Sequence, residues 1–318
     1  MSGVSDYDEF GLFHENIDEF DLTVTEIPPV VRVEAVVGDD AGNDRTVSSL
    51  RWGAGSPELV LVHGGAQNAH TWDTVALGLG RPLLAVDLPG HGHSDWRADG
   101  AYTPMNLADD LAVVIERHAP DARAVVGMSL GGMTSMELAV RHPHLVRSLV
   151  MVDITPGVNA AKTKAVIDFV DGPQSFPSFD DLLARTMEFN PTRSESSLRR
   201  GILHNAHQRP DGSWEWNYDR GSHARSRGTD ADSSPAEVAD DPAPDTVSPL
   251  WEHFGAIACP IMLVRGSLSP VVDDDDVAEA RRRQPTLTVV VVDGAGPSVQ
   301  GDRPVELTAL LADWLTTH

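Results

Sequence analysis

The sequence has a single cysteine, Cys259, so an intrachain disulfide is excluded. This residue stands just before an apolar run, a setting typical of a small buried thiol rather than of a nucleophile. No apolar stretch approaches the roughly 20 residues that span a bilayer. The acidic first residues also lack the basic and then apolar segments of a secretory leader. We therefore expect a cytoplasmic protein.

Basic residues are scarce as well. Lysine and arginine together number 24 against 48 aspartates and glutamates, which gives a net charge of -24. A field of this sign repels the phosphates of nucleic acids and the surface of an anionic membrane. We expect neither as a partner, and we expect a small-molecule substrate or ligand instead.

What the sequence does contain is a series of short apolar runs separated by helix-length segments. The runs cover residues 59–63, 83–87, 123–129, 147–153, 261–266 and 287–293. Continuous apolar runs of this length indicate strands covered on both faces, and hence a mainly parallel sheet. Two earlier segments, at about 22–37 and 45–52, alternate better and predict an antiparallel hairpin at the edge. The fold class is therefore α/β.

This alternation breaks between about residues 155 and 256, where helical patterns dominate. Within that stretch, residues 220–249 are rich in Gly, Ser, Pro, Asp and Ala, a composition that predicts a flexible loop. We expect a core formed by residues 1–154 and 257–318, with a helical lid over residues 155–256 inserted after the sixth strand.

The run DDDD at residues 273–276 allows two interpretations. Four acids suggest a metal site, but the ligand spacing and the glycine of an EF-hand are absent. The segment ends in EARRR, so acids in the first turn and bases in the last suit the dipole of a helix. We favour the helix, and we expect no metal site and no cofactor.

Three motifs follow predicted strands. The pattern G-x-S-x-G over residues 127–131 lies between an apolar strand and a helix, and its small residues permit a sharp turn that exposes the Ser129 hydroxyl. His63-Gly64-Gly65 follows an earlier strand, where such loops supply an N–H group to an oxyanion. The third motif, DLPGHGHSD, occupies residues 87–95.

Together these motifs resemble the α/β-hydrolase superfamily, over about residues 50–154 and 257–318. The resemblance implies that Ser129 is a nucleophile and that the N–H groups of Gly65 and Leu130 stabilise the oxyanion. It also implies an acid. The usual G-x-x-D loop reads RGSLSP here and has Ser269 at the acid's position, whereas a subset of the family places the acid one strand earlier, where Asp153 stands. Asp153 is alternatively a helix cap or turn residue; we favour it as the acid.

The base that the resemblance implies is missing. The family's histidine follows the last strand, and DGAGPSVQ places Pro297 at that position. Proline has no titratable group and cannot accept the serine proton. Another histidine could act as the base instead, although each one could equally have a structural role. The candidates are His63, His70, His91, His93, His204 and His207.

Aromatic residues gather in or near the predicted lid. They either line an apolar pocket or fix the lid onto the core. We expect the substrate to contact residues beside the nucleophile and in this aromatic group, namely His63, Gly64, Trp72, Met128 and Trp214.

Three functions stay open at this point. The chain is a serine hydrolase acting on an ester, lactone or carbon–carbon bond of a small apolar substrate, with a non-standard base or as a variant whose parent has histidine at position 297. It is alternatively a catalytically impaired protein that binds a small ligand. The third option is a non-hydrolytic enzyme that uses the oxyanion hole alone.

Overall fold

The computed structural model describes residues 7–38, 44–220 and 248–318. The loop predicted at residues 220–249 therefore lies almost wholly outside the described residues. Within them, no helix is both long enough and apolar enough to cross a membrane.

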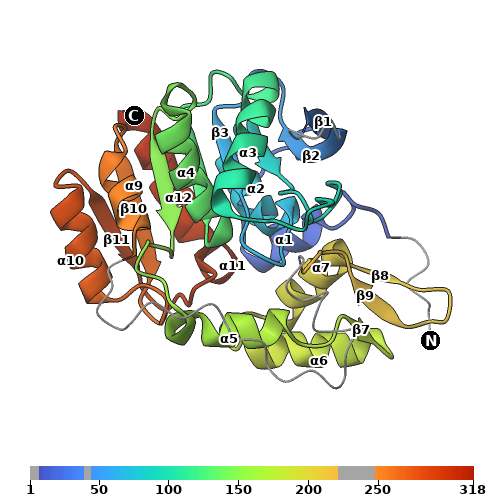
Figure 1. Ribbon diagram of the computed structural model, residues 1–318. Helices are drawn as coiled ribbons and strands as arrows, with labels where there is room; N and C mark the ends of the chain where they lie inside the picture. Colours follow the sequence, from blue (N-terminus) through green and yellow to red (C-terminus); the bar gives the residue numbers. More distant parts are fainter. Residues whose placement is uncertain (1–6, 39–43, 221–247) are drawn as a thin grey trace.

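An eight-stranded sheet forms the centre of the described structure (Figure 1). Its spatial order is β1-β2-β4-β3-β5-β6-β10-β11. The strand bounds are Val30–Gly38 (β1), Asp44–Trp52 (β2), Leu59–Val62 (β3), Leu83–Val86 (β4), Ala124–Met128 (β5), Leu149–Val152 (β6), Ile261–Gly266 (β10) and Thr288–Val292 (β11). The strands from β4 to β11 pair in parallel, while β2 runs antiparallel to both β1 and β4. The predicted parallel sheet and its antiparallel hairpin are confirmed, although β1 starts only after Pro28 and Pro29, which lack the N–H groups that a ladder needs.

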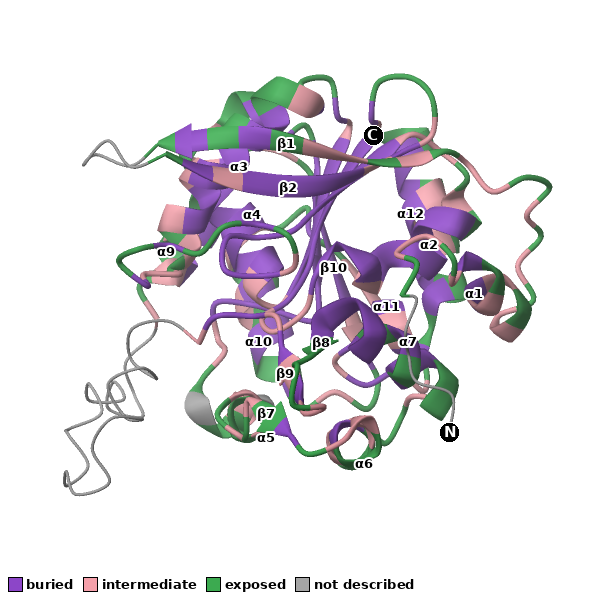
Figure 2. Cartoon of the chain, turned by 90° about the vertical axis from the view of Figure 1, so that its right-hand side faces the viewer, coloured by how far each residue is buried: buried purple, intermediate pink, exposed green. Residues whose placement is uncertain are grey.

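The two faces of the sheet carry separate layers of helices, as Figure 2 shows with the buried strands between them. Because side chains alternate along a strand, Val60 and Val62 of β3 join one apolar cluster while Leu59 and Leu61 join the other. The first cluster includes residues of α3 (Pro104–His118), α4 (Leu130–Arg141), α9 (Leu250–Ala256) and α10 (Asp274–Arg283). The second includes residues of α1 (Phe13–Glu19), α2 (Asp73–Leu79) and α12 (Pro304–Thr317).

A smaller unit lies across one end of this sandwich (Figure 1), and we call its residues 155–220 the insertion. Its elements are α5 (Ala160–Val170), β7 (Ser175–Phe176), α6 (Phe179–Phe189), α7 (Glu195–Asn205), β8 (Ala206–Gln208) and β9 (Trp214–Trp216). It has its own apolar cluster, which includes Leu182, Ile202 and Trp216. Helix α9 falls in the range expected for the lid, yet its Trp251 and Phe254 pack in the core cluster against the sheet.

The DDDD run begins helix α10. Asp273 caps the helix by accepting a hydrogen bond from the N–H of Asp276 at 2.9 Å, and the Asp276 carboxylate accepts one from the N–H of Asp273 at 3.1 Å. Lys162 of α5 pairs with the same two carboxylates at 2.9 and 2.6 Å. The acids therefore cap a helix and attach the insertion to the core.

Helix α4 packs closely against the end of β3, and only glycine fits at the contact. A β-carbon on Gly131 would lie 2.4 Å from the carbonyl oxygens of both Val62 and His63. We expect Gly131→Ala to lower the free energy of unfolding by about 1–3 kcal/mol, because backbone atoms must move to make room. The shift in the urea midpoint measures the change, provided that the free energy of unfolding falls with urea concentration at the same slope in both proteins.

Gly201→Ala is the matched control, since Gly201 is exposed in α7 and a β-carbon there meets no atom within 4 Å. Alanine in an open helix position should stabilise by roughly 0.5–1 kcal/mol. Equal stability of the two variants would contradict the close approach of α4 to β3.

Candidate active site

Ser129 occupies the turn between β5 and α4 in a conformation that side chains rarely adopt. Its φ is 49° and its ψ is -119°, and the side chain is partly exposed. A non-glycine residue at positive φ costs on the order of 1–3 kcal/mol and persists only where its surroundings enforce it. The enforcement comes from close packing, since a β-carbon on Gly127 would lie 2.3 Å from the carbonyl oxygen of Gly131. The sequence therefore folds into the strained turn that its motif predicts.

The loop after β3 is held rigid by two buried imidazoles. His63 donates from Nδ1 to the carbonyl of Gly64 at 2.7 Å and accepts at Nε2 from the N–H of Leu88 at 2.9 Å. His91 accepts at Nε2 from the N–H of Ala66 at 3.1 Å. Burial lowers the pKa of His63 to about 3. His63 is thus a neutral residue that shapes the loop.

Two backbone N–H groups near Ser129 are available to an oxyanion. Within the described residues, the N–H of Gly65 has no hydrogen-bond partner. Leu130 is the first residue of α4, where N–H groups have no partner within the helix. Gly64 lies against Met128 and Ser129, since a β-carbon on it would be 2.5 Å from the Met128 sulfur and 3.3 Å from the Ser129 β-carbon. Gly64 and Met128 are therefore immediate neighbours of Ser129.

Asp153 follows β6 at a φ of 53° and is 2% exposed. Its carboxylate accepts hydrogen bonds from the N–H of Gly266 at 3.0 Å and from the hydroxyl of Ser269 at 2.5 Å. The two positions where the family places its acid thus lie in contact. Burial raises the pKa of Asp153 to about 7, although both hydrogen bonds act in the opposite direction.

The turn that carries Pro297 lies against the loop that holds Asp153. A β-carbon on Gly266 would lie 2.3 Å from the carbonyl oxygen of Gly296, and the N–H of Leu268 donates to the carbonyl of Ala295 at 2.9 Å. Asp302 fixes the same turn by accepting from the N–H of Gly296 at 2.7 Å. Position 297 is thus next in the chain to Gly296, whose carbonyl oxygen contacts the loop that binds the Asp153 carboxylate.

No imidazole of the described segments is hydrogen-bonded to the Ser129 hydroxyl. The histidines that the sequence offered as substitutes have other partners. His63 and His91 hold the loop after β3, His70 binds Asp73 and Glu9, His204 binds Tyr7, His207 binds Asn217, and His93 lies 3.8 Å from Glu9.

A cavity of about 130 Å³ lies between the core and the insertion. It is bounded by the loop at residues 66–74, by helices α6 and α7, and by Gln300 and Gly301 of α11 (Val299–Asp302). Its lining mixes apolar side chains such as Ile202 and Trp216 with Arg193 and Arg200. Trp72 and Trp214 do not line this cavity. Trp72 is fully buried in the core, and Trp214 packs edge-on against Phe179 with ring centroids 5.0 Å apart.

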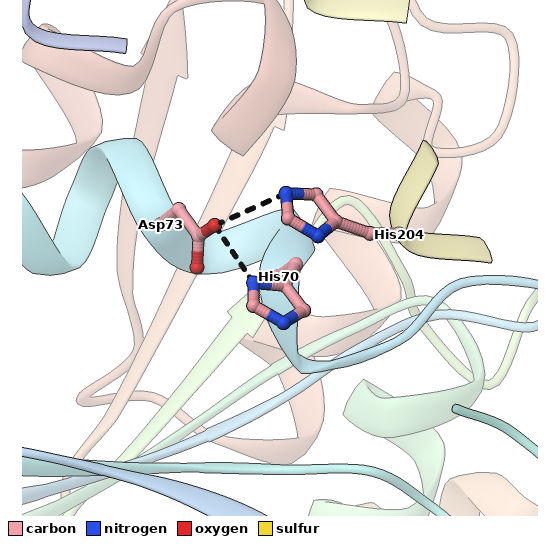
Figure 3. A group of neighbouring side chains, drawn as sticks. All are labelled: His70, Asp73 and His204. Carbon is pink, nitrogen blue, oxygen red and sulfur yellow. Dashed lines mark hydrogen bonds and ion pairs between the residues drawn. The ribbon is translucent and has the colours of Figure 1, made fainter. Parts of the chain in front are cut away.

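A further group borders this cavity and was not expected from the sequence. His70, Asp73 and His204 converge there (Figure 3), although His204 belongs to the insertion and the other two to the core. Burial alone would lower the pKa of His70, but the carboxylates of Asp73 and Glu9 raise it to about 9. The spacing of His70 and Asp73 on one helical turn is visible in the sequence. The approach of His204 is not, because it depends on how the insertion docks.

A family model and two curated relatives that resemble this chain are all hydrolases or describe a hydrolase fold. A family model described as "alpha/beta hydrolase fold" matches residues 57–304. The esterase Rv0045c of Mycobacterium tuberculosis is 41% identical over 318 residues, which cover 98% of this chain and 97% of that protein. The 2-(acetamidomethylene)succinate hydrolase of Mesorhizobium japonicum is 28% identical over 255 residues, 79% of this chain and 85% of that one.

The solved structures agree. A structure of the M. tuberculosis esterase Rv0045c, from work on its transition metal inhibition, has a TM-score of 0.79 and 40% identity, covering 99% of this chain and 100% of that one. A structure of E-2-(acetamidomethylene)succinate hydrolase has a TM-score of 0.71 and 25% identity, covering 90% of this chain and 100% of that one.

The raised pKa of Asp153 predicts a pH-dependent difference in stability. The native state favours the protonated carboxyl group of Asp153. The contribution of this group to the free energy of unfolding is therefore fully present below the ordinary pKa of 3.8 and is lost as pH rises towards 7. Asp153→Asn mimics the neutral acid and escapes this loss. Relative to the parent, we expect its free energy of unfolding to rise by about 1.4 kcal/mol per pH unit well below pH 7. The total between pH 5 and pH 7 is about 2 kcal/mol, because the change levels off near the folded pKa.

Chemical denaturation at the two pH values measures this difference. Asp121→Asn is the control, because the Asp121 side chain is 74% exposed. A gap between parent and Asp153→Asn that stays constant with pH would refute the buried neutral acid.

Proposed function

Because this chain belongs to the α/β-hydrolase fold family, we propose that it presents an ester-hydrolysing site in which Ser129 is the nucleophile and Pro297 replaces the base. The observation that carries the proposal is the strained turn at Ser129, together with the N–H groups of Gly65 and Leu130, which have no partner among the described residues. The likeness to an esterase over nearly the whole chain supports an ester as the substrate class.

The chemistry assigned to the site begins with attack of the Ser129 oxygen on the ester carbonyl carbon. The carbonyl oxygen then becomes an oxyanion and takes hydrogen bonds from the N–H groups of Gly65 and Leu130. Donors fixed in place before the reaction stabilise such charge most effectively. The close packing around Gly127 and Gly131 keeps the turn rigid, so the second donor is fixed in this way.

As the Ser129 oxygen attacks, its proton must pass to an acceptor, which returns it to the leaving alcohol when the ester C–O bond breaks. Water then attacks the acyl group on Ser129 with the help of the same acceptor, and this releases the carboxylic acid. A histidine at position 297 would follow a turn fixed by Asp302 and would face the loop that holds Asp153. Asp153 would then orient the imidazole and stabilise its charged form. With proline there, the serine proton has no imidazole to receive it. Loss of this base in serine hydrolases lowers turnover about a millionfold, while oxyanion and binding effects persist.

Ligand binding without turnover is the second candidate function. It is favoured by the absence of any imidazole bonded to the Ser129 hydroxyl in the described segments. In both cases we propose that the insertion acts as a lid, because helices α6 and α7 cover the cavity. The lining of this cavity carries Arg193 and Arg200 beside apolar side chains, and it does not include Ser129, Gly65 or Leu130.

The decisive experiment compares hydrolysis of a short-chain activated ester by the parent, Pro297→His and Ser129→Ala. We expect the parent to match Ser129→Ala and Pro297→His to exceed both by several orders of magnitude, since the substitution restores the base to a fixed turn. The double variant Pro297→His with Ser129→Ala is the control and should lose the gain.

Turnover by the parent far above Ser129→Ala would mean that another group accepts the proton, and the impaired site would be refuted. A Pro297→His variant that folds but stays inactive would refute the assignment of position 297. A reactive fluorophosphonate checks the nucleophile separately in Pro297→His: attack by Ser129 displaces fluoride and leaves a phosphonyl group on the serine oxygen, which mass spectrometry detects.

A further inference from the structure

The cavity between the core and the insertion has a cation in its lining that the protein does not neutralise. Most charged side chains of the lining are paired: Asp73 lies 2.9 Å from His70, and Arg200 forms an ion pair with Glu19. Arg193 lines the cavity as well, yet it forms no ion pair with any carboxylate that the structure describes. An unpaired guanidinium at a cavity wall is a candidate binding group for an anion.

The hydrogen bonds of Arg193 leave most of its donors free. One Nη donates to the hydroxyl of Ser197 at 2.6 Å, and Nε is buried with no partner in the described segments. A guanidinium has five N–H donors in a planar fork. The group also lies against the core, since a β-carbon on Gly301 of α11 would be 2.8 Å from its central carbon. Arg193 therefore reaches from the insertion to the core with its fork largely unused.

The surroundings of Arg193 do not supply the missing negative charge. Burial lowers the pKa of the guanidinium, and the nearby charge of Arg200 acts in the same direction. The carboxylates of Asp302 and Glu19 oppose this lowering from beyond ion-pair distance. Both are used elsewhere: Asp302 accepts from the N–H of Gly296 at 2.7 Å, and Glu19 pairs with Arg200. A buried charge without a partner is costly, so an anion at this wall is favoured.

Gln300 provides a second unsatisfied group, next in the chain to Gly301. Its side chain is 1% exposed and lines the same cavity. Its Nε2 donates to the hydroxyls of Thr71 at 3.3 Å and Ser298 at 3.1 Å, while its Oε1 is buried without a partner among the described residues. Because hydroxyls both donate and accept, turning the amide over keeps both contacts and places the NH₂ group where the unpaired oxygen stands. Gln300 thereby supplies a neutral donor beside the cation.

The size and the apolar part of the cavity limit what the cation can bind. One water needs about 10–15 Å³ of such space, so the volume of about 130 Å³ holds roughly ten non-hydrogen atoms. Apolar side chains complete the lining, among them Phe169, Ile202 and Trp216. The rings of Phe169 and Trp216 meet edge to face with centroids 6.0 Å apart. The space suits a short apolar tail rather than a second charged group.

We propose that this cavity binds a small monocarboxylate, with its carboxylate on Arg193 and Gln300 and its apolar tail on the side chains of the insertion. The planar fork of arginine matches a carboxylate, and one unpaired cation among the described lining residues matches one negative charge. This ligand is distinct from the ester assigned to Ser129, because Ser129 does not line the cavity. The inference therefore stands whether or not the chain hydrolyses esters.

The test titrates the full chain with hexanoate by calorimetry and compares it with hexanamide, which has the same shape without the charge. We expect one hexanoate site per chain and an affinity at least about 10-fold higher than for hexanamide. Arg193→Gln should weaken hexanoate binding about 10–100-fold, because it removes a charge-assisted hydrogen-bond donor. Ser129→Ala should bind hexanoate as the parent does.

Arg199→Gln is the matched control. It removes the same charge from the exposed side of α7, where Arg199 lies 3.2 Å from Glu15 and outside the cavity lining. It should leave hexanoate binding unchanged. Equal binding by Arg193→Gln and Arg199→Gln would overturn the site. So would equal affinities for hexanoate and hexanamide, or a parent that binds no hexanoate at millimolar concentrations, since water alone would then solvate the guanidinium.

A crystal structure with 6-bromohexanoate tests the site without any substitution, and it decides the matter if Arg193→Gln does not fold. Anomalous scattering locates the bromine. We expect the bromine among the apolar side chains of the cavity and the carboxylate on the Arg193 guanidinium. A carboxylate bound to any other side chain would overturn the proposal.

Discussion

The buried carboxylate of Asp87 holds two loops in place, the one that carries Ala69 and the one that carries His93. It lies at the end of β4 with no exposed surface. It pairs with Arg32 of β1 at 2.8 Å, and it accepts hydrogen bonds from the N–H groups of Ala69 at 2.7 Å and His93 at 3.0 Å. Burial alone would raise the pKa of Asp87, but the Arg32 guanidinium holds it below its usual range. Removing one member of such a pair costs about 3–5 kcal/mol, because the other charge stays buried.

The candidate active site and the cavity both border a loop that this anchor holds. The loop at residues 63–73 begins beside Ser129 with Gly65 and ends with His70 and Asp73, and its Ala69 is held by Asp87. Arg32 also contacts Glu9, which in turn contacts His70. One charged network therefore links the edge hairpin, the N-terminal segment and the three-residue group, and the cavity borders the loop along much of its length.

The sequence predicted the central sheet and the turn at Ser129, because both follow from local patterns. Apolar runs specify buried strands, and glycines at positions 127 and 131 are needed wherever backbones approach closely. The contact between Asp153 and Ser269 was not predictable, since it forms across two strands whose neighbours depend on the sheet order. Likewise, α9 has a helical sequence that does not tell whether it packs on the insertion or, as it does, on the sheet.

The place of the insertion in the chain has a consequence for synthesis. Strand β6 pairs with β5 on one side and with β10 on the other, and β10 follows the insertion. A ribosome that adds about 5–20 residues per second makes the segment between Asp153 and Gly266 in on the order of ten seconds. During that time one edge of β6 has no strand beside it, and the carboxyl group of Asp153 has neither of its two donors. An open strand edge is a template for pairing with other chains. The nascent chain is therefore most exposed to misassembly while the carboxyl group of Asp153 is still solvated.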